Sequence, residues 1–334
     1  MFQSDEKEAL IFSTGTYETQ IGLAGNDRPN YIVSNFSDKF NYLLSEDGCF
    51  NDCFFDFLGE FLVEKSISLE KQSVLFNEPL KENKKNRERI VSVLFEKDGV
   101  SEFFICNSGV LTSFSFGKST CLLLDSAHSH SSVVPIHDGL LLKSALKTSK
   151  INGKFINDLI ATKLQGSQIL TGNPLYNLNR VKCAYFESKG EFNGELTLPD
   201  ERKLSVAIGR DVYDEIMKEG FDVNSPNSFY KCIFDSISSV QLDIKRELIE
   251  NIFVSGGNSL ISENFCSEIK EKLRQIVAQN TKVGVRTHTS KVERNLGCFL
   301  GSSILASLSV FSEYTIKNEE YQEYGAGIVE RKCA

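Results

Sequence analysis

The amino-acid sequence predicts a mixed α/β protein built from two related halves. Two segments follow one plan, ALIFSTGTYETQIGLAG over residues 9–25 and CLLLDSAHSHSSVVPIHDG over residues 121–139. Each begins with a short apolar run typical of a buried strand, turns through small residues, and continues as a second strand that ends near glycine. A third segment, ENIFVSGGNSLI over residues 250–261, predicts a strand, a glycine turn and the beginning of a helix. Strands that alternate with helices indicate an α/β architecture.

The first part of the chain is predicted to start as a meander and to continue with alternating helices and strands. We expect a three-stranded meander over residues 9–33, with turns at Thr14-Gly15 and near Asn26-Asp27. The phenylalanine-rich segment 35–71 predicts one helix around Cys53–Glu64. Residues 91–105 predict the end of a helix, a turn at Asp98-Gly99 and a strand, and Val110–Phe116 predicts a further helix.

The second part has weaker periodicity between residues 150 and 230. We expect strands at Val181–Glu187 and Leu204–Ile208, a long helix over residues 228–250 with Phe229, Ile233, Ile237 and Val240 on one face, and an apolar helix at Leu300–Ser312. No linker or low-complexity segment separates the halves, so we expect them to pack closely around a cleft.

Composition places the chain among ordinary globular proteins. It has 334 residues, of which 41% are hydrophobic and 25% charged. The net charge of −8 argues against strong direct DNA binding, which needs a basic surface, and is compatible with basic partners such as histones. Nine scattered cysteines without a CxxC pair predict reduced thiols in a cytosolic or nuclear protein. We expect no membrane association, because no apolar run approaches the roughly 20 residues of a spanning helix and the polar N-terminus resembles no signal peptide.

The two turns at the ends of the paired strands are the candidate binding site. Backbone N–H groups in such turns hold phosphate groups. We therefore predict nucleotide contacts from the first turn, the second turn and the later glycine pair, namely Thr14, Gly15, Thr16, Asp125, Ser126, Ala127, Gly256 and Gly257. A phosphotransferase also needs acidic groups for its metal ion, but the first turn has Ser13 there and only Asp125 remains in the second. This favours binding or scaffolding over catalysis.

Two further features of the sequence have both a functional and a structural interpretation. His128 and His130 lie two residues apart, which on a strand places them on opposite faces, so we expect no metal site there. The basic segment KENKKNRER over residues 81–89 is typical of a nuclear localisation patch and also of the exposed first turns of a helix, since Ile90, Val93 and Leu94 follow at helical spacing.

Several ordered blocks of the sequence resemble actin. They are the first strand–turn–strand, NEPLKENKKNRERIVSVLFE, GKSTCLLLDS with VPIHDG, and DIKRELIENIFVSGGNSLI. The C-terminal run, VERNLGCFLGSSILASLSVFSEYTIKNEEYQEYGAGIVERKCA, is more similar still to the nuclear actin-related protein 4 subfamily. The match is poor over residues 35–71 and 150–230, which are shorter than in actin.

The resemblance implies an actin fold, in which two RNase H-like α/β halves surround a central nucleotide cleft and the outer subdomains are reduced. We expect a first inner subdomain of residues 1–34, 72–116 and 297–334, a reduced outer subdomain of 35–71, a second inner subdomain of 117–149 and 233–296, and a second outer subdomain of 150–232. The loop through which actin polymerises belongs in 35–71, where we find no counterpart, so filament formation is not expected.

The resemblance also implies a function and the positions that would serve it. Members of this subfamily pair with nuclear actin on a scaffold helix of chromatin-remodelling or histone-acetyltransferase complexes and contact histones, which implies a nuclear location. The resemblance implies that the catalytic and phosphate-binding positions of actin correspond in this sequence to Ser13, Gln20, Ser108, Asp125, His128 and Ser132. With one carboxylate and no base, we expect no enzyme activity. ATP or ADP binding would be weak and structural.

A partner groove is the other site implied by the resemblance. Its positions are all apolar or small, as suits an amphipathic helix, and fall on Phe114, Gly117, Ile304, Leu305, Leu308 and Val310. The same spacing also suits an ordinary core helix. Two rival functions stay open, an active sugar-kinase-like or chaperone-like ATPase and a divergent cytoskeletal actin.

Overall fold

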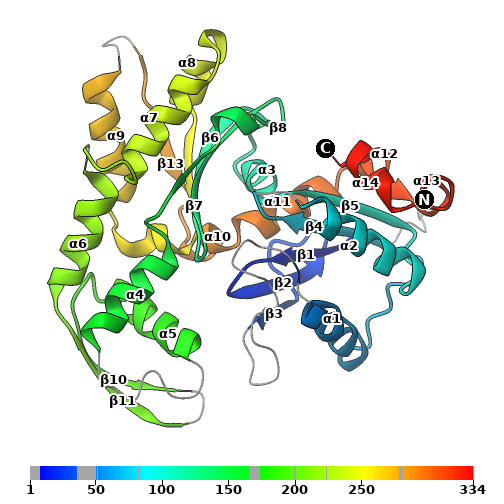
Figure 1. The fold of residues 1–334 in the computed structure, drawn as a ribbon, viewed down its shortest axis with the longest axis horizontal. Coiled ribbons are helices and arrows are strands. Elements are labelled where there is room, and N and C mark those ends of the chain that lie inside the picture. The colour runs from blue at the N-terminus through cyan, green and yellow to red at the C-terminus, as the bar shows by residue number, and fades with distance from the viewer. Residues whose placement is uncertain are drawn as a thin grey trace. The chain divides into compact units, whose positions relative to one another are not determined.

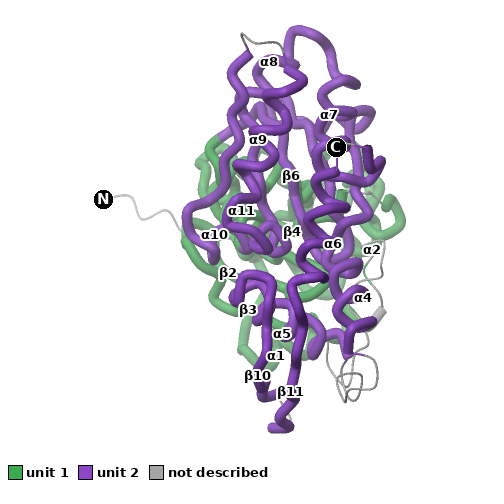
Figure 2. Tube along the Cα trace, turned by 90° about the vertical axis from the view of Figure 1, so that its left-hand side faces the viewer, with its two compact units in different colours: residues 1–117, 296–334 green, residues 118–295 purple. Residues whose placement is uncertain are grey.

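The computed structural model describes residues 8–35, 50, 52–80, 83–164, 174–198, 201–222, 224–277 and 281–333. The chain divides into two compact units, unit 1 of Met1–Gly117 with Leu296–Ala334 and unit 2 of Lys118–Asn295. Figure 2 draws them in green and purple. The predicted division into four subdomains stays a prediction, and residues 36–49 and 51 of the predicted reduced outer subdomain lie outside the described residues.

Unit 1 is built on a six-stranded mixed sheet in the order β14-β5-β4-β1-β2-β3 (Figure 1). Its strands are β1 (Leu10–Thr14), β2 (Glu18–Leu23), β3 (Tyr31–Ser34), β4 (Ser73–Glu78), β5 (Glu102–Asn107) and β14 (Ile316–Lys317). The first three strands form an antiparallel meander, whereas β4 runs parallel to both β1 and β5. All of β1 is buried, because both faces of the sheet are covered.

Helices cover both faces of this sheet. They are α1 (Asp52–Glu64), α2 (Lys84–Glu96), α3 (Ser108–Ser115), α11 (Gly297–Ala306), α12 (Phe311–Tyr314), α13 (Asn318–Tyr324) and α14 (Val329–Lys332), with the 3₁₀ helix η4 (Ala326–Ile328). Neighbouring residues of β1 point to opposite faces, so Phe12 packs with α1 and α2 while Ile11 packs with α3 and α11.

Unit 2 contains a second mixed sheet, ordered β13-β12-β6-β7-β8, with β9 also paired to β7. Its strands are β6 (Cys121–Ser126), β7 (Ser131–His137), β8 (Leu140–Leu141), β9 (Lys147–Ser149), β12 (Ile252–Ser255) and β13 (Val285–Thr287). As in unit 1, the first strand pairs antiparallel with the next and parallel with a much later one, β12, which pairs parallel with β13. The prediction of two related α/β halves is confirmed.

The rest of unit 2 is helical apart from one hairpin. Its elements are the 3₁₀ helix η1 (Lys143–Ala145), α4 (Gly153–Lys163), α5 (Pro174–Glu187), the hairpin β10 (Phe192–Thr197) and β11 (Lys203–Ile208), α6 (Arg210–Phe221), α7 (Phe229–Ser239), α8 (Leu242–Glu250), the 3₁₀ helix η3 (Gly257–Ile261), α9 (Phe265–Ile276) and α10 (Lys291–Asn295). One core joins the sheet to α4 through α9.

Most of the predicted elements are confirmed, including the meander, the helix around Cys53–Glu64, the strand at Leu204–Ile208 and the strand–glycine turn–helix segment. The strand predicted at Val181–Glu187 is wrong, because these residues form the second half of α5. Val181 and Tyr185 are completely buried and lie four residues apart, so they share one helix face.

Two predicted helices are shorter than expected. The helix predicted over residues 228–250 is two helices, because the backbone of Val240 and Gln241 is extended between α7 and α8. Ser238 and Ser239 at the end of α7 are weak helix formers, which favours this break. The helix predicted at Leu300–Ser312 begins at Gly297 and ends at Ala306, where the N–H of Ser307 closes the last turn.

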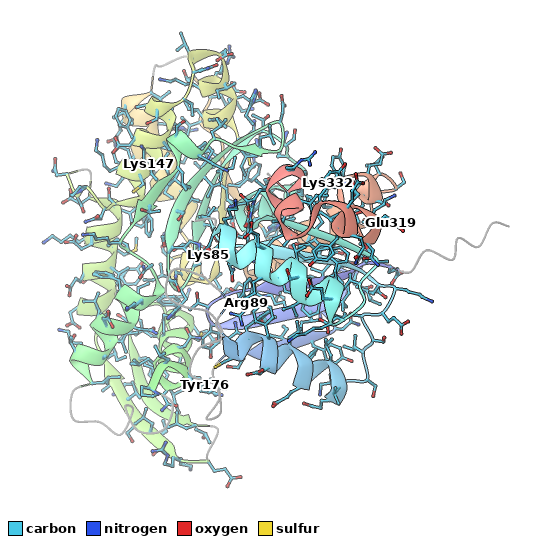
Figure 3. All side chains as sticks on the ribbon, turned by 45° about the vertical axis from the view of Figure 1, so that its right-hand side comes forward. Lys85, Arg89, Lys147, Tyr176, Glu319 and Lys332 are labelled. Carbon is cyan, nitrogen blue, oxygen red and sulfur yellow. The ribbon has the colours of Figure 1, made fainter. Side chains whose placement is uncertain are left out.

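The basic segment before Ile90 is only partly exposed, contrary to the expectation. Helix α2 begins at Lys84, and Lys85 and Arg89 are exposed on it (Figure 3). Arg87, however, is buried, and its guanidinium forms a bidentate ion pair with the carboxylate of Glu78 at the end of β4. The distance between Arg87 Nε and Glu78 Oε2 is 2.6 Å. Arg87 therefore stabilises the attachment of α2 to the sheet.

Candidate functional site

The first predicted turn lies between β1 and β2 in unit 1. Gly15 N donates to Glu18 O at 2.9 Å, which closes the turn. Thr14 is held by Asn77 at the end of the parallel strand β4, because Asn77 Oδ1 accepts from Thr14 N at 2.6 Å and from Thr14 Oγ1 at 2.9 Å. Asn77 Nδ2 returns a bond to Thr14 O at 2.9 Å. The turn is thus fixed from its own sheet, by an asparagine that sequence analysis did not identify.

The charge at this turn is unsuited to a phosphate chain. Gln20 stands where the resemblance places a phosphate-binding lysine, and its Nε2 donates to Glu18 Oε1 at 2.8 Å. Ser13, at the position of the metal-associated acid, is buried in β1. The turn therefore presents the carboxylate of Glu18 next to a neutral amide, and a carboxylate repels phosphate.

The second predicted turn joins β6 to β7 in unit 2. Ser126 Oγ and Ser131 Oγ lie 2.9 Å apart across the strand pair, and Ala127 N donates to His130 O at 2.9 Å. Asp125 is largely buried, and burial raises its pKa, which His130 partly opposes from 3.8 Å between Nε2 and Oδ2.

The glycine pair lies against this second turn. Strand β12 pairs with β6 so that Ser255 is opposite Asp125, and the chain then turns at Gly256 with φ of +89°. A side chain at Gly256 would collide with the backbone of Ser126, so only glycine fits. Gly257 begins η3, and a side chain there would start 2.7 Å from Asn295 Oδ1.

The structure thus brings together five of the eight predicted nucleotide contacts, Asp125, Ser126, Ala127, Gly256 and Gly257, all in unit 2. Thr14, Gly15 and Thr16 lie in unit 1. Nucleotide binding by these residues and the central cleft stay predictions.

The two histidines lie in the turn between β6 and β7, so the prediction that they lie on a strand is wrong. His128 Nδ1 and His130 Nε2 are buried and have no hydrogen-bond partner. The pKa of His128 is lowered to about 4 by burial and by the nearby cations of Lys182 and Lys154. Within the described residues, no group of three or more His, Cys, Asp or Glu side chains is arranged to hold a metal ion.

The positions of the predicted partner groove lie where α3 packs against α11. This contact is very close, because Gly301 of α11 faces the carbonyl group of Leu111 and leaves no room for a side chain. Ile304, Leu308 and Val310 are 45%, 47% and 41% exposed, whereas Leu305 is 9% exposed and belongs to the core. Phe114 is half-buried against that core, and Gly117, with φ of +64°, follows the end of α3.

We call Ile304, Leu308 and Val310, together with Phe114, the α3–α11 surface. Three of its four side chains, those of Ile304, Leu308 and Val310, are substantially exposed, so they do not serve only to form the core. Leu305 is the exception among the predicted groove residues, because it points into the core.

These features define a class of protein: two α/β units whose central strands follow the same order, each with a tight turn after its first strand. The family model for actin matches residues 57–203 and 209–334. The chain belongs to the actin family and has the actin fold.

Relatives with curated names agree with this assignment. The chain is 27% identical to "Actin-related protein 4" of Oryza sativa over 326 residues, covering 80% of this chain and 72% of the relative. It is 26% identical to "Putative actin-29" of Dictyostelium discoideum, covering 82% and 75%. It is 25% identical to "Actin-like protein 9" of Rattus norvegicus, covering 97% and 89%. The protein is therefore an actin-related protein.

No helix in the described part of the chain has both the length and the apolar character needed to cross a membrane.

Proposed function

We propose that this chain is a non-catalytic, actin-related subunit of a nuclear chromatin-remodelling or histone-acetyltransferase complex. It pairs there with actin on an amphipathic scaffold helix and contacts histones. The observation that carries the proposal is the exposure of Ile304 near the end of α11 and of Leu308 and Val310 in the segment that follows it. The similarity to relatives named actin-related protein 4 supports the choice of complex.

The α3–α11 surface suits a helix because its apolar side chains project from a rigid base. Leu308 follows a helix that is packed along α3 and closed by Ser307. An amphipathic helix that covered Ile304, Leu308 and Val310 would bury the exposed half of three apolar side chains, and each would contribute about half of the roughly 1.5–3 kcal/mol that full burial gives.

The experiment is affinity purification of the tagged full chain from nuclear extract, with identification of the proteins that co-purify. We expect actin together with a helicase-type or acetyltransferase scaffold. The variant Leu308→Asp should lose the scaffold and keep most of its thermal stability, because Leu308 is already 47% exposed and does not belong to the core.

Leu242→Asp is the matched control, since Leu242 is 83% exposed but lies on α8 in unit 2. It should retain the scaffold. A Leu308→Asp protein that aggregates, or that folds and still captures the scaffold, would refute the role of the α3–α11 surface.

The absence of catalysis is proposed from the positions of the catalytic groups. Ser13, Ser108, His128 and Ser132 occupy four of them, and loss of one preorganised group commonly lowers a rate by about 10²–10³. We expect no ATPase activity above background. Steady-state turnover that Asp125→Ala abolishes would favour the rival ATPase function.

Nucleotide is proposed to bind weakly and to serve structure only. Gln20 supplies no positive charge in the first turn, and its amide is already bonded to Glu18. The measurement is ion-exchange chromatography of the supernatant from freshly purified, denatured protein. A stoichiometric ATP or ADP peak would show that binding is tight.

Nuclear location and histone contact are supported by charge. The exposed Lys85 and Arg89 on α2 suit a localisation signal, and the net charge of −8 suits a basic partner. Imaging of a fluorescently tagged chain and pull-down with purified histones test the two points separately. Cytoplasmic filaments would instead indicate a divergent cytoskeletal actin.

A further inference from the structure

A pocket of about 370 Å³ lies in unit 1 at the C-terminal end of α1. Its lining includes Leu62 and Leu69, which are buried side chains of the core that α1 shares with β1 and β4. Asp98, in the turn between α2 and β5, also lines it. This core covers the opposite face of the unit 1 sheet from α3 and α11, so the pocket is separate from the α3–α11 surface.

The end of α1 is capped in a way that fixes the shape of the pocket. Ile67 N donates to Leu62 O at 2.9 Å, and Ser66 N donates to Val63 O at 3.1 Å. These two bonds are the pattern of a helix that ends in a left-handed residue, and Ser66, with φ of +55°, is that residue. All four residues line the pocket. Because hydrogen bonds hold their backbone, the pocket is preformed.

The segment that follows this cap is bonded to the turn that carries Asp98. Lys71 N donates to Gly99 O at 3.0 Å. Ser101 N donates to Gln72 O, also at 3.0 Å. These bonds fix the turn, and with it Asp98, beside the end of α1.

The carboxylate of Asp98 is half-buried and lacks a partner. Within the part of the chain that the structure describes, it forms no hydrogen bond and no ion pair. Burial raises the pKa of Asp98, and the neighbouring cation of Lys97 opposes this only in part. Glu70 adds a second negative charge nearby, since its Cγ is 3.6 Å from the point where a side chain at Gly99 would begin. A cation from outside would compensate the hydration that the Asp98 carboxylate has lost.

Two residues of α1 leave the pocket open to an approaching chain. Gly59 is exposed, and no atom of the described residues lies within 4 Å of the point where its side chain would begin. A glycine inside a helix is destabilising relative to alanine, and the packing around Gly59 does not require it. Val63, one turn further along α1, is 81% exposed. Gly59 thus permits close approach of a partner's backbone, and Val63 offers that partner an apolar contact.

We propose that this pocket of unit 1 binds a basic segment of a partner protein, in which an arginine or lysine stands next to an apolar residue. The stem of the basic side chain lies on Leu62 and Leu69, and its charged end pairs with the carboxylate of Asp98. The apolar neighbour contacts Val63, and the backbone of the segment passes over Gly59. Charge selects this occupant, because Asp98 would repel an acidic segment and a purely apolar one would bury the carboxylate unpaired.

The test begins with peptides selected from a random display library. The library is first depleted on the immobilised Asp98→Asn protein and then selected on the immobilised wild-type chain, so that the retained peptides depend on the Asp98 carboxylate. We expect the selected sequences to share an arginine or lysine next to an apolar residue. A fluorescein-labelled selected peptide is then titrated by fluorescence anisotropy, together with a neutral copy that carries citrulline for arginine or acetyl-lysine for lysine.

The neutral copy should bind about 10-fold more weakly or worse, because a charge-assisted contact is lost, and Asp98→Asn should weaken the original peptide to a similar extent. Gly59→Gln should also weaken it, because the new side chain occupies the approach to the pocket. This second variant should fold at least as stably as the wild type, since glutamine is a better helix former than glycine. Asp27→Asn is the matched control, because Asp27 is an exposed acid between β2 and β3 of the same unit, and it should bind as the wild type does.

Several outcomes would overturn the proposal. They are the absence of any enriched peptide, enriched peptides without a basic residue, equal binding of the neutral copy, and equal affinity of Asp98→Asn and wild type. Leu308→Asp should bind the peptide as the wild type does, and a loss of binding in that variant would place the peptide on the α3–α11 surface instead. Because the scaffold experiment is read on Leu308, failure of one proposal is distinguishable from failure of the other.

Discussion

Two buried basic side chains, Arg87 and Lys182, show how differently the same kind of residue is used in the two units. Arg87 is neutralised by a two-pronged ion pair with Glu78 and lies 3.6 Å from Glu330, so it joins α2 to β4 and to the C-terminal helix. Lys182 is similarly buried, and no carboxylate among the described residues forms an ion pair with it. Arg87 is stabilised by its ion pair, whereas the buried ammonium group of Lys182 reduces stability at neutral pH.

The stability of a Lys182→Met variant is the prediction at this scale. The folded-state pKa of Lys182 is about 8 and the ordinary value is 10.5, so the unfolded chain holds a proton between these values that the folded chain lacks. Stability therefore rises with pH from about 8 to 10.5, and the full penalty is present below pH 8.

In phosphate-free buffer at pH 7, Lys182→Met should be more stable than the wild type by up to about 3 kcal/mol. The difference should shrink by pH 10.5. Urea denaturation at both pH values measures it. A variant that is less stable than the wild type at pH 7 would show that the ammonium group is satisfied in the folded protein.

At the scale of elements, the turn after β12 requires glycine at position 256 for two reasons, of which a sequence motif indicates only the first. A positive φ alone explains many glycines, and Gly25, with φ of +82°, has open space around it. Gly256 has a similar φ of +89° and in addition lies against the backbone of Ser126 on β6. The difference arises because β12 and β6 are adjacent parallel strands, although they are distant in sequence.

Alanine at these two glycines should therefore have unequal effects. Gly25→Ala should cost about 1 kcal/mol, the strain of a left-handed backbone. Gly256→Ala should cost well over 4 kcal/mol or prevent folding, because the backbone of the second turn must move. Thermal denaturation of the two variants compares them, and equal losses would mean that the turn adjusts freely.

At the scale of the whole molecule, the two units have separate cores. The core of unit 2 consists of residues between Leu122 and Val283, while both cores of unit 1 combine the N-terminal part with the C-terminal tail. Unit 2 is also one continuous stretch of chain, whereas unit 1 is completed only when the last residues are present. The two units should thus differ in how they fold.

The segment 118–295 should fold by itself. We expect a purified fragment to show a cooperative urea transition and helical circular dichroism, because its core and sheet need no residue from elsewhere. A fragment of residues 1–117 should not fold, because it lacks α11, which packs on α3 in unit 1. A fragment 118–295 without a cooperative transition would contradict the prediction.

The sequence by itself determined the class of the protein and most of its elements. The repeated strand–turn–strand plan, the GG turn and the C-terminal run are local patterns, so the two α/β halves and the family could be predicted from them. Local patterns also singled out Asp125 and Gly256, whereas the groove residues were assigned through the resemblance to actin, and one of them, Leu305, belongs to the core.

Only the tertiary structure decided what surrounds those residues. Asn77 holds Thr14 because β4 lies beside β1, and Lys182 reaches the second turn because α5 packs next to α4 and η3. A signal for Lys182 existed, since it stands with Leu178, Val181 and Tyr185 at helical spacing, but the segment was predicted as a strand. Contacts between residues distant in sequence depend on how the helices and strands pack, and a periodicity confined to one element carries no information about its neighbours.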